Sequence, residues 1–405
     1  MAKRLLLFAA TTGYQIRVFA DAARRLGCDL TLATDRCHIL EDPWGDRAIP
    51  VKFDRIPESL ELLRGRAFDG VAAVGDLPAV LAAEAAEVLG VPFHAPAAAR
   101  AGHDKYLARQ LYRAAGLQVP EFFRAELARG PRDLAARAPY PCVLKPLGLS
   151  AGRGVIRAND EKEFAAAFER IRKIGEKHVQ MEGYIPGREF AIEGVATHGR
   201  FQPLAIFDKP DPLEGPYFEE TIYVTPSREE ATVQAALIET AARAVRTLGL
   251  RHGPVHAEMR YNEAGAWMLE AHARPIGGLC ARALRFEDGM PLEELILRHA
   301  LGEDVSGARL ADAASGVMMI PIPKGGVYQS AAGEEQARAV AGIEDVVITA
   351  KPGQQMIPLP EGSSYLGFIF ARGDSAAEVE AALRQSHAQL RFEIATSLET
   401  LSPSS

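Results

Sequence analysis

A lysine, a Gly-rich loop and several carboxylates between positions 145 and 270 are the candidate functional residues of this chain. Lys145 closes the apolar run 142–144, so its charge enters a mostly buried place, which is costly unless an anion compensates it. The glycines of the following loop free backbone amides to converge on phosphate oxygens. A surface hairpin turn is the alternative for the loop alone, but with Lys145 beside it the pattern favours a phosphate site. The predicted loop contacts are Gly148, Ser150, Gly152, Arg153 and Gly154.

Two further carboxylates, Glu258 and Glu270, lie in apolar stretches typical of strands, twelve residues apart. The turn at 262–265 predicts that they are cross-strand neighbours, and adjacent carboxylates repel each other unless a cation bridges them. Mg²⁺ is the predicted cation, with Mn²⁺ as the alternative. An exposed sheet face is the other interpretation. Arg274, two residues past the second strand, could stabilise charge that develops on a phosphoryl group or a tetrahedral intermediate.

An acidic segment lies between these two groups. Glu182 and Glu189 flank residues 184–186, which could connect two lobes. In a nucleotide pocket the backbone of Tyr184 and Ile185 would meet the adenine edge, and a carboxylate would bind the ribose hydroxyls. Two solvated glutamates around a turn are the alternative.

The periodicity of the chain predicts the elements that position these residues. Strands and helices alternate near the N-terminus, which indicates a parallel sheet, and later strands follow one another as in an antiparallel sheet. The turn at Thr11–Gly13 is either a plain strand-to-helix connection or a phosphate loop. The predicted N-terminal elements are strands 4–10, 29–33 and 70–74 and helices 15–26 and 77–89. The predicted central elements are strands 140–145, 154–157, 178–183, 188–197, 202–207, 254–261 and 266–272 and helices 161–174 and 229–248. Near the C-terminus we expect strands 316–322, 345–350 and 366–371 and a helix at 375–390.

Length and composition limit the number of domains, the kinds of partner and the cellular location. A chain of 405 residues exceeds what one hydrophobic core usually serves, so two or three domains are expected. The formal charge of -7 argues against nucleic acid as the main partner, and no apolar run is long enough for a membrane span. Four scattered cysteines without CxxC spacing suit reduced thiols in the cytoplasm. A homodimer is the commonest assembly for a soluble enzyme of this size.

The order and spacing of these motifs resemble the ATP-grasp superfamily of carboxylate–amine ligases, over essentially the whole chain. Within it, the stretches 207–210, 219–221, 226–227, 256–258 and 269–278 resemble the L-amino-acid ligases that make dipeptides. The resemblance implies an α/β and α+β multidomain protein with an N-terminal parallel α/β domain (1–100), an ATP-grasp core (101–310, with a Gly-rich lobe at about 120–183) and a small C-terminal α+β domain (311–405). It also implies that Lys105 binds phosphate and that Glu189 binds ribose.

One position departs from the family pattern. Many relatives have Glu-x-Asn as metal ligands where this chain has Glu270-Ala271-His272. Glu258 and Glu270 are therefore the expected metal carboxylates. His272 either ligates the metal through a ring nitrogen, or supports a metal ligand or contacts the substrate, and magnesium's preference for oxygen argues against direct ligation.

The chemistry implied by the resemblance is ATP-dependent amide formation from a small-molecule carboxylate, with an L-amino acid as the expected acid, and an amine. Lys105 and Lys145 would bind the phosphates while an acyl phosphate forms, and Arg274, Gly277 and Gly278 would hold the acyl oxygen as the amine attacks. Residues implied in the substrate pocket are Glu219, Glu220, His256, His272 and Arg274. The alternatives are a carboxylase-like or purine-pathway enzyme that uses carboxyphosphate or formyl phosphate, and a nucleotide-binding regulator without turnover.

Overall fold

The computed structural model describes residues 2–10, 14–35 and 48–396. The chain divides into two compact units, each built from three stretches of sequence. Unit 1 comprises residues 1–123, 185–208 and 225–312, and unit 2 comprises residues 124–184, 209–224 and 313–405. Each unit therefore contains segments that are far apart in the chain. The three domains expected along the sequence stay a prediction.

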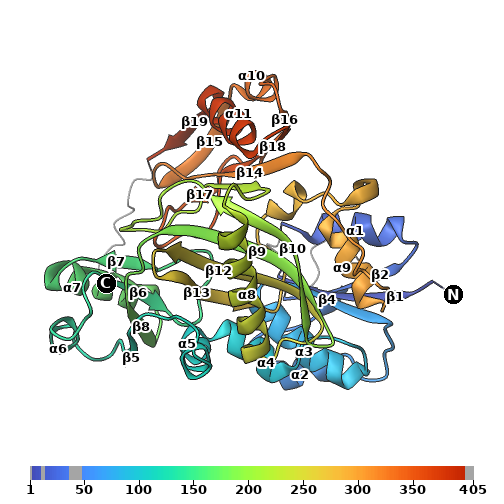
Figure 1. Ribbon diagram of the computed structural model, residues 1–405, viewed down its shortest axis with the longest axis horizontal. Helices are drawn as coiled ribbons and strands as arrows, with labels where there is room; N and C mark the ends of the chain where they lie inside the picture. Colours follow the sequence, from blue (N-terminus) through green and yellow to red (C-terminus); the bar gives the residue numbers. More distant parts are fainter. Residues whose placement is uncertain (1, 11–13, 36–47, 397–405) are drawn as a thin grey trace, which may run out of the picture. The chain divides into compact units, whose positions relative to one another are not determined.

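Unit 1 begins with a parallel sheet in the strand order β3-β2-β1-β4. β1 is buried from Leu5 onward, as expected for an apolar strand with a parallel neighbour on each side. Leu7 pairs with Leu32 of β2 and with Ala72 of β4, so the carboxyl ends of these strands lie side by side (Figure 1). The elements are β1 (Arg4–Ala9), α1 (Ile16–Arg25), β2 (Asp29–Thr34), β3 (Ala48–Pro50), α2 (Ile56–Glu61), β4 (Gly70–Val74) and α3 (Asp76–Leu89).

The second sheet of unit 1 has the strand order β13-β12-β9-β10, with β12 antiparallel to both of its neighbours. Helix α4 approaches β13 closely at Gly102, where a Cβ atom would lie 2.8 Å from the Ala271 carbonyl oxygen. Glycine is therefore required at that position. The elements are α4 (Pro96–His103), α5 (Lys105–Ala114), β9 (Arg188–Thr197), β10 (Arg200–Lys209), α8 (Ala231–Leu248), β12 (Gly253–Asn262), β13 (Gly265–His272), the 3₁₀ turns η2 (Cys280–Ala283) and η3 (Glu287–Gly289), and α9 (Leu292–Ala300).

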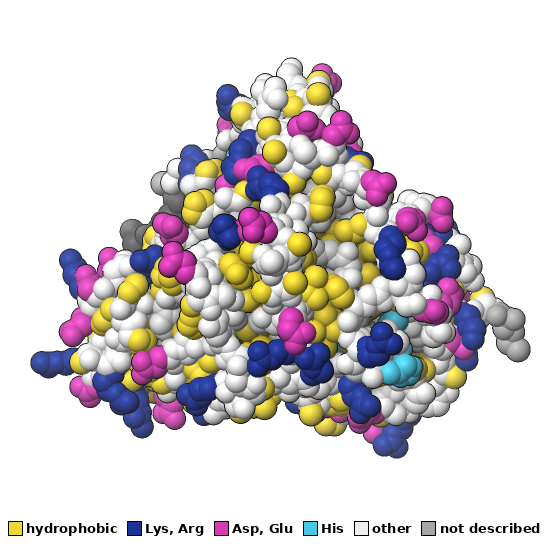
Figure 2. Space-filling view, viewed as in Figure 1, with side chains coloured by type: hydrophobic (Ala, Val, Ile, Leu, Met, Phe, Trp, Pro, Cys, Tyr) yellow, Lys and Arg dark blue, Asp and Glu magenta, His cyan; other side chains and the backbone are white. Residues whose placement is uncertain are grey.

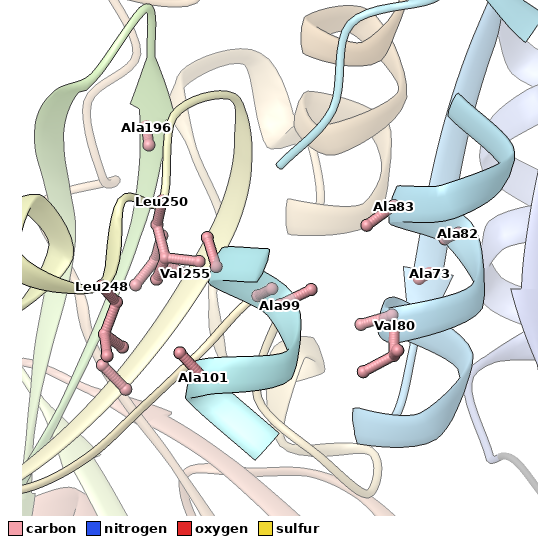
Figure 3. Close-up of a cluster of buried hydrophobic side chains, with 14 of the residues drawn as sticks. Ala73, Val80, Ala82, Ala83, Ala99, Ala101, Ala196, Leu248, Leu250 and Val255 are labelled. Carbon is pink, nitrogen blue, oxygen red and sulfur yellow. The ribbon is translucent and has the colours of Figure 1, made fainter. Parts of the chain in front are cut away.

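One hydrophobic core joins the two sheets of unit 1. It runs from the parallel sheet through the alanine-rich helices α3 and α4 to β9, β12 and β13. Figure 3 shows Ala82 and Ala83 of α3, Ala99 and Ala101 of α4, and Val255 of β12 within this core. Alanine lets helices pack closely and loses no side-chain entropy on burial. The N-terminal sheet and the antiparallel sheet are thus held together by continuous packing.

Unit 2 carries the Gly-rich lobe, a sheet in the order β5-β8-β6-β7. Its helix α7 begins at an Asp160 cap, whose side chain accepts a hydrogen bond from the Glu163 amide at 2.8 Å. The apolar face of α7 buries Phe164, Phe168 and Ile171. The elements are β5 (Phe122–Glu126), α6 (Arg132–Ala135), β6 (Cys142–Pro146), β7 (Ile156–Ala158), α7 (Glu161–Ile174) and β8 (His178–Gly183).

The rest of unit 2 is the C-terminal α+β part. Strands β11, β14, β18 and β16 are neighbours in that order, and β17-β15-β19 form a small separate sheet. α11 packs on β14 and β18, as the red and orange elements of Figure 1 show. The elements are β11 (Ile222–Thr225), β14 (Ala314–Ile320), β15 (Gly326–Ala332), α10 (Glu334–Arg338), β16 (Ile343–Ile348), β17 (Gln355–Met356), β18 (Gly367–Gly373), α11 (Ala376–Gln389) and β19 (Arg391–Ala395).

The fold matches the predicted class, a parallel α/β part followed by antiparallel α+β parts. The helix at Glu161–Ile174 has its predicted bounds, whereas α9 and the small C-terminal sheet were not predicted. The turn at 11–13 and Cys37 lie outside the described residues, and Cys28, Cys142 and Cys280 form no disulfide with one another. Among the residues that the structure describes, no helix has the length and apolar character to span a bilayer. Acidic and basic side chains are interspersed on the face shown in Figure 2.

Candidate active site

Two glutamates and two histidines face one another in pairs on the hairpin β12–β13. Glu258 is opposite Glu270, and His256 is opposite His272, with a bulge just after Glu258. Asn262 shapes the turn, because its side-chain oxygen accepts from the Ala264 amide at 2.9 Å and from the Trp267 indole at 3.1 Å. The prediction that the two glutamates are cross-strand neighbours is confirmed. Both carboxylates are partly exposed, Glu258 by 18% and Glu270 by 21% of the side chain.

Lys105 lies at the start of α5 and reaches the same hairpin. Asp104 caps the helix by accepting from the amides of Tyr106 and Leu107. Arg109, one turn further on, donates to the carbonyl oxygens of Met268 at 2.6 Å and Leu269 at 3.0 Å, and so ties α5 to β13. The Lys105 ammonium then lies 3.8 Å from a carboxylate oxygen of Glu270. The structure thus brings the predicted phosphate lysine and a predicted metal carboxylate together within unit 1.

Each histidine lies between two carboxylates. His256 contacts Glu193 through Nδ1 and Glu258 through Nε2 at 3.2 Å. Burial would lower the pKa of His256, but Glu193 and Glu258 raise it to about 9. His272 contacts Glu270 through Nε2 at 3.0 Å, and its Nδ1 lies 3.1 Å from Asp76. These contacts engage both rings with protein acids, which favours a role in holding carboxylates; contact with substrate remains a prediction.

The segment 274–278, which holds the predicted acyl-oxygen residues, is anchored at several points. Arg274 Nε donates to Asp76 at 2.6 Å. The Ile276 amide donates to Glu193 at 2.9 Å, and the Ile276 carbonyl accepts from the Gln15 side chain at 2.6 Å. Burial would raise the pKa of Asp76, but Arg274 and His272 lower it well below its usual range. Gly277 and Gly278 follow, the latter with a φ of 60°.

In unit 2, Lys145 pairs with Glu182. Their strands β6 and β8 are antiparallel, and Lys145 Nζ lies 2.6 Å from a Glu182 oxygen with both side chains buried. Gln180 donates to the other Glu182 oxygen at 2.8 Å. The anion that compensates Lys145 in this structure is therefore a carboxylate. Tyr184, next in the predicted hinge, has the Arg157 guanidinium 4.0 Å above its ring.

The Gly-rich loop is held at its second half. The Gly154 amide donates to the Pro360 carbonyl at 2.8 Å, and Arg153 Nε donates to the Glu361 carbonyl at 2.9 Å. Arg170 of α7 binds both oxygens of the Glu361 carboxylate. Gly148, by contrast, has no atom within 4 Å of where a Cβ would lie, and Ser150 is exposed. The first half of the loop is thus the open half.

Glu189, the predicted ribose acid, belongs to unit 1 and is held by Arg260. Arg260 is buried on β12, and it donates to Glu189 at 2.8 Å and to the Ile185 carbonyl at 2.7 Å. A carboxylate oxygen of Glu189 also lies within 4.8 Å of one of Glu258. One arginine thus fixes both a hinge carbonyl and the predicted ribose acid.

The predicted substrate acids Glu219 and Glu220 lie in unit 2. Glu220 forms an ion pair with Lys209, whose side chain is buried. Burial raises the pKa of Glu219, and a hydrogen bond from the Ile322 amide opposes the rise. The Lys209 ammonium also lies 5.1 Å from the centre of the Tyr223 ring. Both glutamates therefore occupy a partly buried, structured region.

The predicted site residues thus form one group in each unit. Sequence reasoning missed four acidic or basic residues that hold them, namely Asp76, Glu193, Arg260 and Glu361. Two of these had a signal in the chain. Glu193 interrupts the apolar strand 190–196, and Asp76 lies two residues after the end of strand β4, at the sheet edge where parallel-sheet proteins bind ligands.

The fold is an ATP-grasp fold, as the comparisons with known proteins show. An ATP-grasp domain family matches residues 138–283, and the L-amino acid ligase C-terminal domain 2 matches residues 318–395. The crystal structure of L-amino acid ligase from Bacillus licheniformis is similar over 97% of this chain and 99% of that chain, with a TM-score of 0.82 and 26% identity.

Two curated ligases are similar in sequence. D-alanine–D-alanine ligase B of Chromobacterium violaceum is 30% identical over 226 residues, which are 53% of this chain and 72% of that protein. Alanine–anticapsin ligase of Bacillus subtilis (strain 168) is 27% identical over 241 residues, which are 53% of this chain and 50% of that protein. The chain spans about half the length of several curated relatives that it matches. The predicted resemblance is confirmed: the chain belongs to the ATP-grasp ligase family.

Proposed function

We propose that this protein is an ATP-dependent carboxylate–amine ligase that couples an L-amino acid, through its carboxylate, to the amine of a second amino acid. The observation that carries the proposal is the pairing of Glu258 with Glu270 on β12–β13, with the Lys105 ammonium 3.8 Å from Glu270. This arrangement offers oxygen ligands to a divalent cation and a positive charge to a phosphate. The C-terminal domain match to L-amino acid ligases supports the choice of amino acids.

The donor set fits magnesium. Glu258 and Glu270 present hard oxygen ligands, partly exposed, from opposed strands, and Mg²⁺ usually takes one or two carboxylates together with phosphate oxygens. His272 is bound to Glu270 and lies beside Asp76, so its proposed part is to hold a ligand rather than to be one. When bound, the metal would neutralise charge on the phosphates and act as a Lewis acid.

The chain's own residues would act in two steps. In the first, an oxygen of the substrate carboxylate bonds to the γ-phosphorus of ATP, the bond to the bridging oxygen breaks, and ADP leaves with that electron pair. Lys105 and Lys145 would bind the phosphates and Glu189 the ribose, while the amides of residues 148–152 would cover the triphosphate. Covering this region excludes water, which would otherwise hydrolyse the acyl phosphate.

In the second step the neutral amine nitrogen bonds to the acyl carbon, the carbon–oxygen bond to phosphate breaks with its electron pair going to the phosphate oxygen, and the proton from the nitrogen passes to the released phosphate. Negative charge develops on the acyl oxygen as the nitrogen adds. Arg274 and the backbone amides of Gly277 and Gly278 are the proposed donors to that oxygen. Glu219 and Glu220 are proposed to recognise the ammonium groups of the amino acids, since carboxylates pair with such cations.

A second candidate function is a carboxyphosphate-type reaction. Enzymes such as N5-carboxyaminoimidazole ribonucleotide synthetase share the fold at TM-scores near 0.7, but their identities of 14–18% show the fold alone. The C-terminal match favours amide formation between amino acids over this alternative. A regulator without turnover is the third candidate.

A panel of amino-acid pairs, with ADP release and product mass measured together, tests the proposal. We expect one ADP for each dipeptide formed, and no ADP in Glu270→Gln. Glu263→Gln, an exposed acid in the turn of the same hairpin, is the matched control and should keep full activity. Bicarbonate-dependent ADP release without dipeptide would favour the carboxyphosphate reaction. ATP binding without ADP from any acid would favour the regulator.

A further inference from the structure

Two sets of contacting side chains lie side by side, each made of an acid, a histidine and a second acid. The second acid of each set is a predicted metal carboxylate. In one, Glu193 contacts His256, which contacts Glu258. In the other, Asp76 lies against His272, which contacts Glu270. The rings of the two histidines stack with their centres 6.2 Å apart. Because β12 and β13 are in register at these positions, the two sets are built alike.

The first acids of the two sets, Glu193 and Asp76, come from different elements. Glu193 lies on β9, directly opposite His256 of β12. Asp76 is the first residue of α3 and follows β4 of the N-terminal parallel sheet, almost two hundred residues before Arg274 in the chain. The continuous core of unit 1 packs α3 and α4 against the antiparallel sheet, which fixes where Asp76 lies. The position of Asp76 is thus decided by tertiary packing.

Asp76 and Glu193 also each bind a residue of the segment 274–278. Asp76 accepts from Arg274 Nε at 2.6 Å, and Glu193 accepts from the Ile276 amide at 2.9 Å. Gln15, buried at the start of α1, completes the set by donating to the Ile276 carbonyl at 2.6 Å. The same two acids therefore contact the histidines that hold the predicted metal carboxylates. Asp76 also holds the proposed donor Arg274, and Glu193 holds Ile276, the residue before Gly277 and Gly278.

A buried carboxylate is costly unless it is paired, and each of these two acids has two partners. Here the two partners of each acid are a histidine bonded to a predicted metal ligand and a group of the segment 274–278. One acid in each case thus connects a histidine beside a predicted metal carboxylate to the segment 274–278. Residues that bind metal ligands without contacting the metal themselves orient those ligands.

We propose that Asp76 and Glu193 are positioning residues for the amide-forming step, because they hold Arg274 and the segment 274–278 in register with Glu258 and Glu270. This inference rests on the proposed ligase function. It assigns to Asp76, which begins the helix after the N-terminal strand β4, an indirect part in the second step. If the segment 274–278 is loosened, an acyl phosphate that has already formed is lost to water instead of to the amine.

The test compares dipeptide formed per ADP released in Asp76→Asn and Glu193→Gln with the wild-type protein. We expect ADP release to continue and dipeptide per ADP to fall about 10-fold or more in each variant, the range seen when residues that bind metal ligands are mutated. Asp76→Glu, which keeps the charge, should recover part of the ratio. Glu294→Gln is the matched control, because Glu294 is a buried acid bonded to Arg25 and Arg298 outside this site.

The ratio distinguishes positioning from stability, since a partly unfolded sample loses ADP and dipeptide together. A wild-type ratio in both Asp76→Asn and Glu193→Gln would overturn the inference, as would an equal loss of both products. If these variants fail to fold, Gln15→Met removes only the bond to the Ile276 carbonyl, and an unchanged ratio there would also overturn it. Failure of the wild-type protein to release ADP with any amino-acid pair refutes instead the proposed function.

Discussion

At the scale of single residues, the buried ion pair of Lys145 and Glu182 shows how a site can be charge-balanced before its ligand arrives. The sequence predicts that a lysine at the end of an apolar strand has an anion beside it, and phosphate is the expected anion. The structure supplies a carboxylate 2.6 Å away, on the neighbouring strand β8. Phosphate binding at Lys145 is therefore proposed as an addition to this pair, with Glu182 fixing the ammonium.

Lys145→Met should cost both activity and stability, because it leaves the buried Glu182 carboxylate without its cation. Breaking a buried pair typically costs about 3–5 kcal/mol, whereas replacing both partners can be neutral. We therefore expect a large fall in the thermal unfolding midpoint for Lys145→Met and a partial recovery for Lys145→Met with Glu182→Gln. ADP release should be absent from both. If the double variant regained turnover, Lys145 would have no role in phosphate binding.

At the scale of elements, the Gly-rich loop has two halves with different constraints. Near Gly148 there is open space, while Gly154 has a φ of +71° and lies so close to β6 that a Cβ would be 2.5 Å from Pro146 Cγ. Hydrogen bonds to Pro360 and Glu361 hold the same end. The loop thus has a fixed end and an open end, which suits a flap that covers phosphates.

Gly154→Ala and Gly148→Ala form a matched pair that tests this division. A left-handed conformation costs an alanine about 1–2 kcal/mol, and the contact with Pro146 adds to it. We expect Gly154→Ala to lower the unfolding midpoint and raise the KM for ATP, and Gly148→Ala to leave the midpoint unchanged. Equal midpoints for the two variants would show that the fixed end is not constrained as described.

At the scale of the whole molecule, buried neutral histidines link stability to pH. His94 and His299 belong to unit 1 and are almost fully buried. His94 Nε2 contacts the Pro254 carbonyl at 2.9 Å, His299 Nε2 contacts Thr197 at 2.8 Å, and the His299 ring stacks on His252. Burial, chiefly, and the neighbouring histidines lower the pKa of both His94 and His299 from 6.5 to about 4.

Between about pH 4 and 6.5 these histidines are protonated in the unfolded chain and neutral in the folded chain. The free energy of unfolding therefore rises with pH over this range. Above pH 6.5 both histidines are neutral in both states and do not lower the free energy of unfolding. As the pH falls towards 4, each histidine lowers that free energy by up to about 3 kcal/mol. His94→Gln should flatten the fall of the unfolding free energy between pH 6.5 and 4.5, measured by denaturant titration. An unchanged pH dependence would show that His94 is not held neutral in the folded protein.

The sequence by itself determined the pieces of this protein. Periodicity marked the parallel and antiparallel sheets and the bounds of Glu161–Ile174, because local hydrophobic patterns report which face of an element is buried. The apolar stretches on either side of the turn at 262–265 predicted a hairpin with Glu258 and Glu270 as neighbours, because a turn brings its two strands together. The register set by the turn alone, in which Met259 pairs with Met268, would put Leu269 opposite Glu258, and the bulge just after Glu258 shifts the partner to Glu270. These are short-range features, and the chain encodes them within a few dozen residues.

Only the tertiary structure decided which distant residues hold the site. Asp76 meets Arg274, and Glu193 meets Ile276, through packing of sheets and helices that no local pattern specifies. Arg260 meets Glu189 across a strand pair whose partners lie about seventy residues apart in the chain. The second half of the Gly-rich loop is fixed by residues 360–361, two hundred positions later in sequence. Such contacts depend on which surfaces the whole core brings together, and that is settled only when the chain is packed.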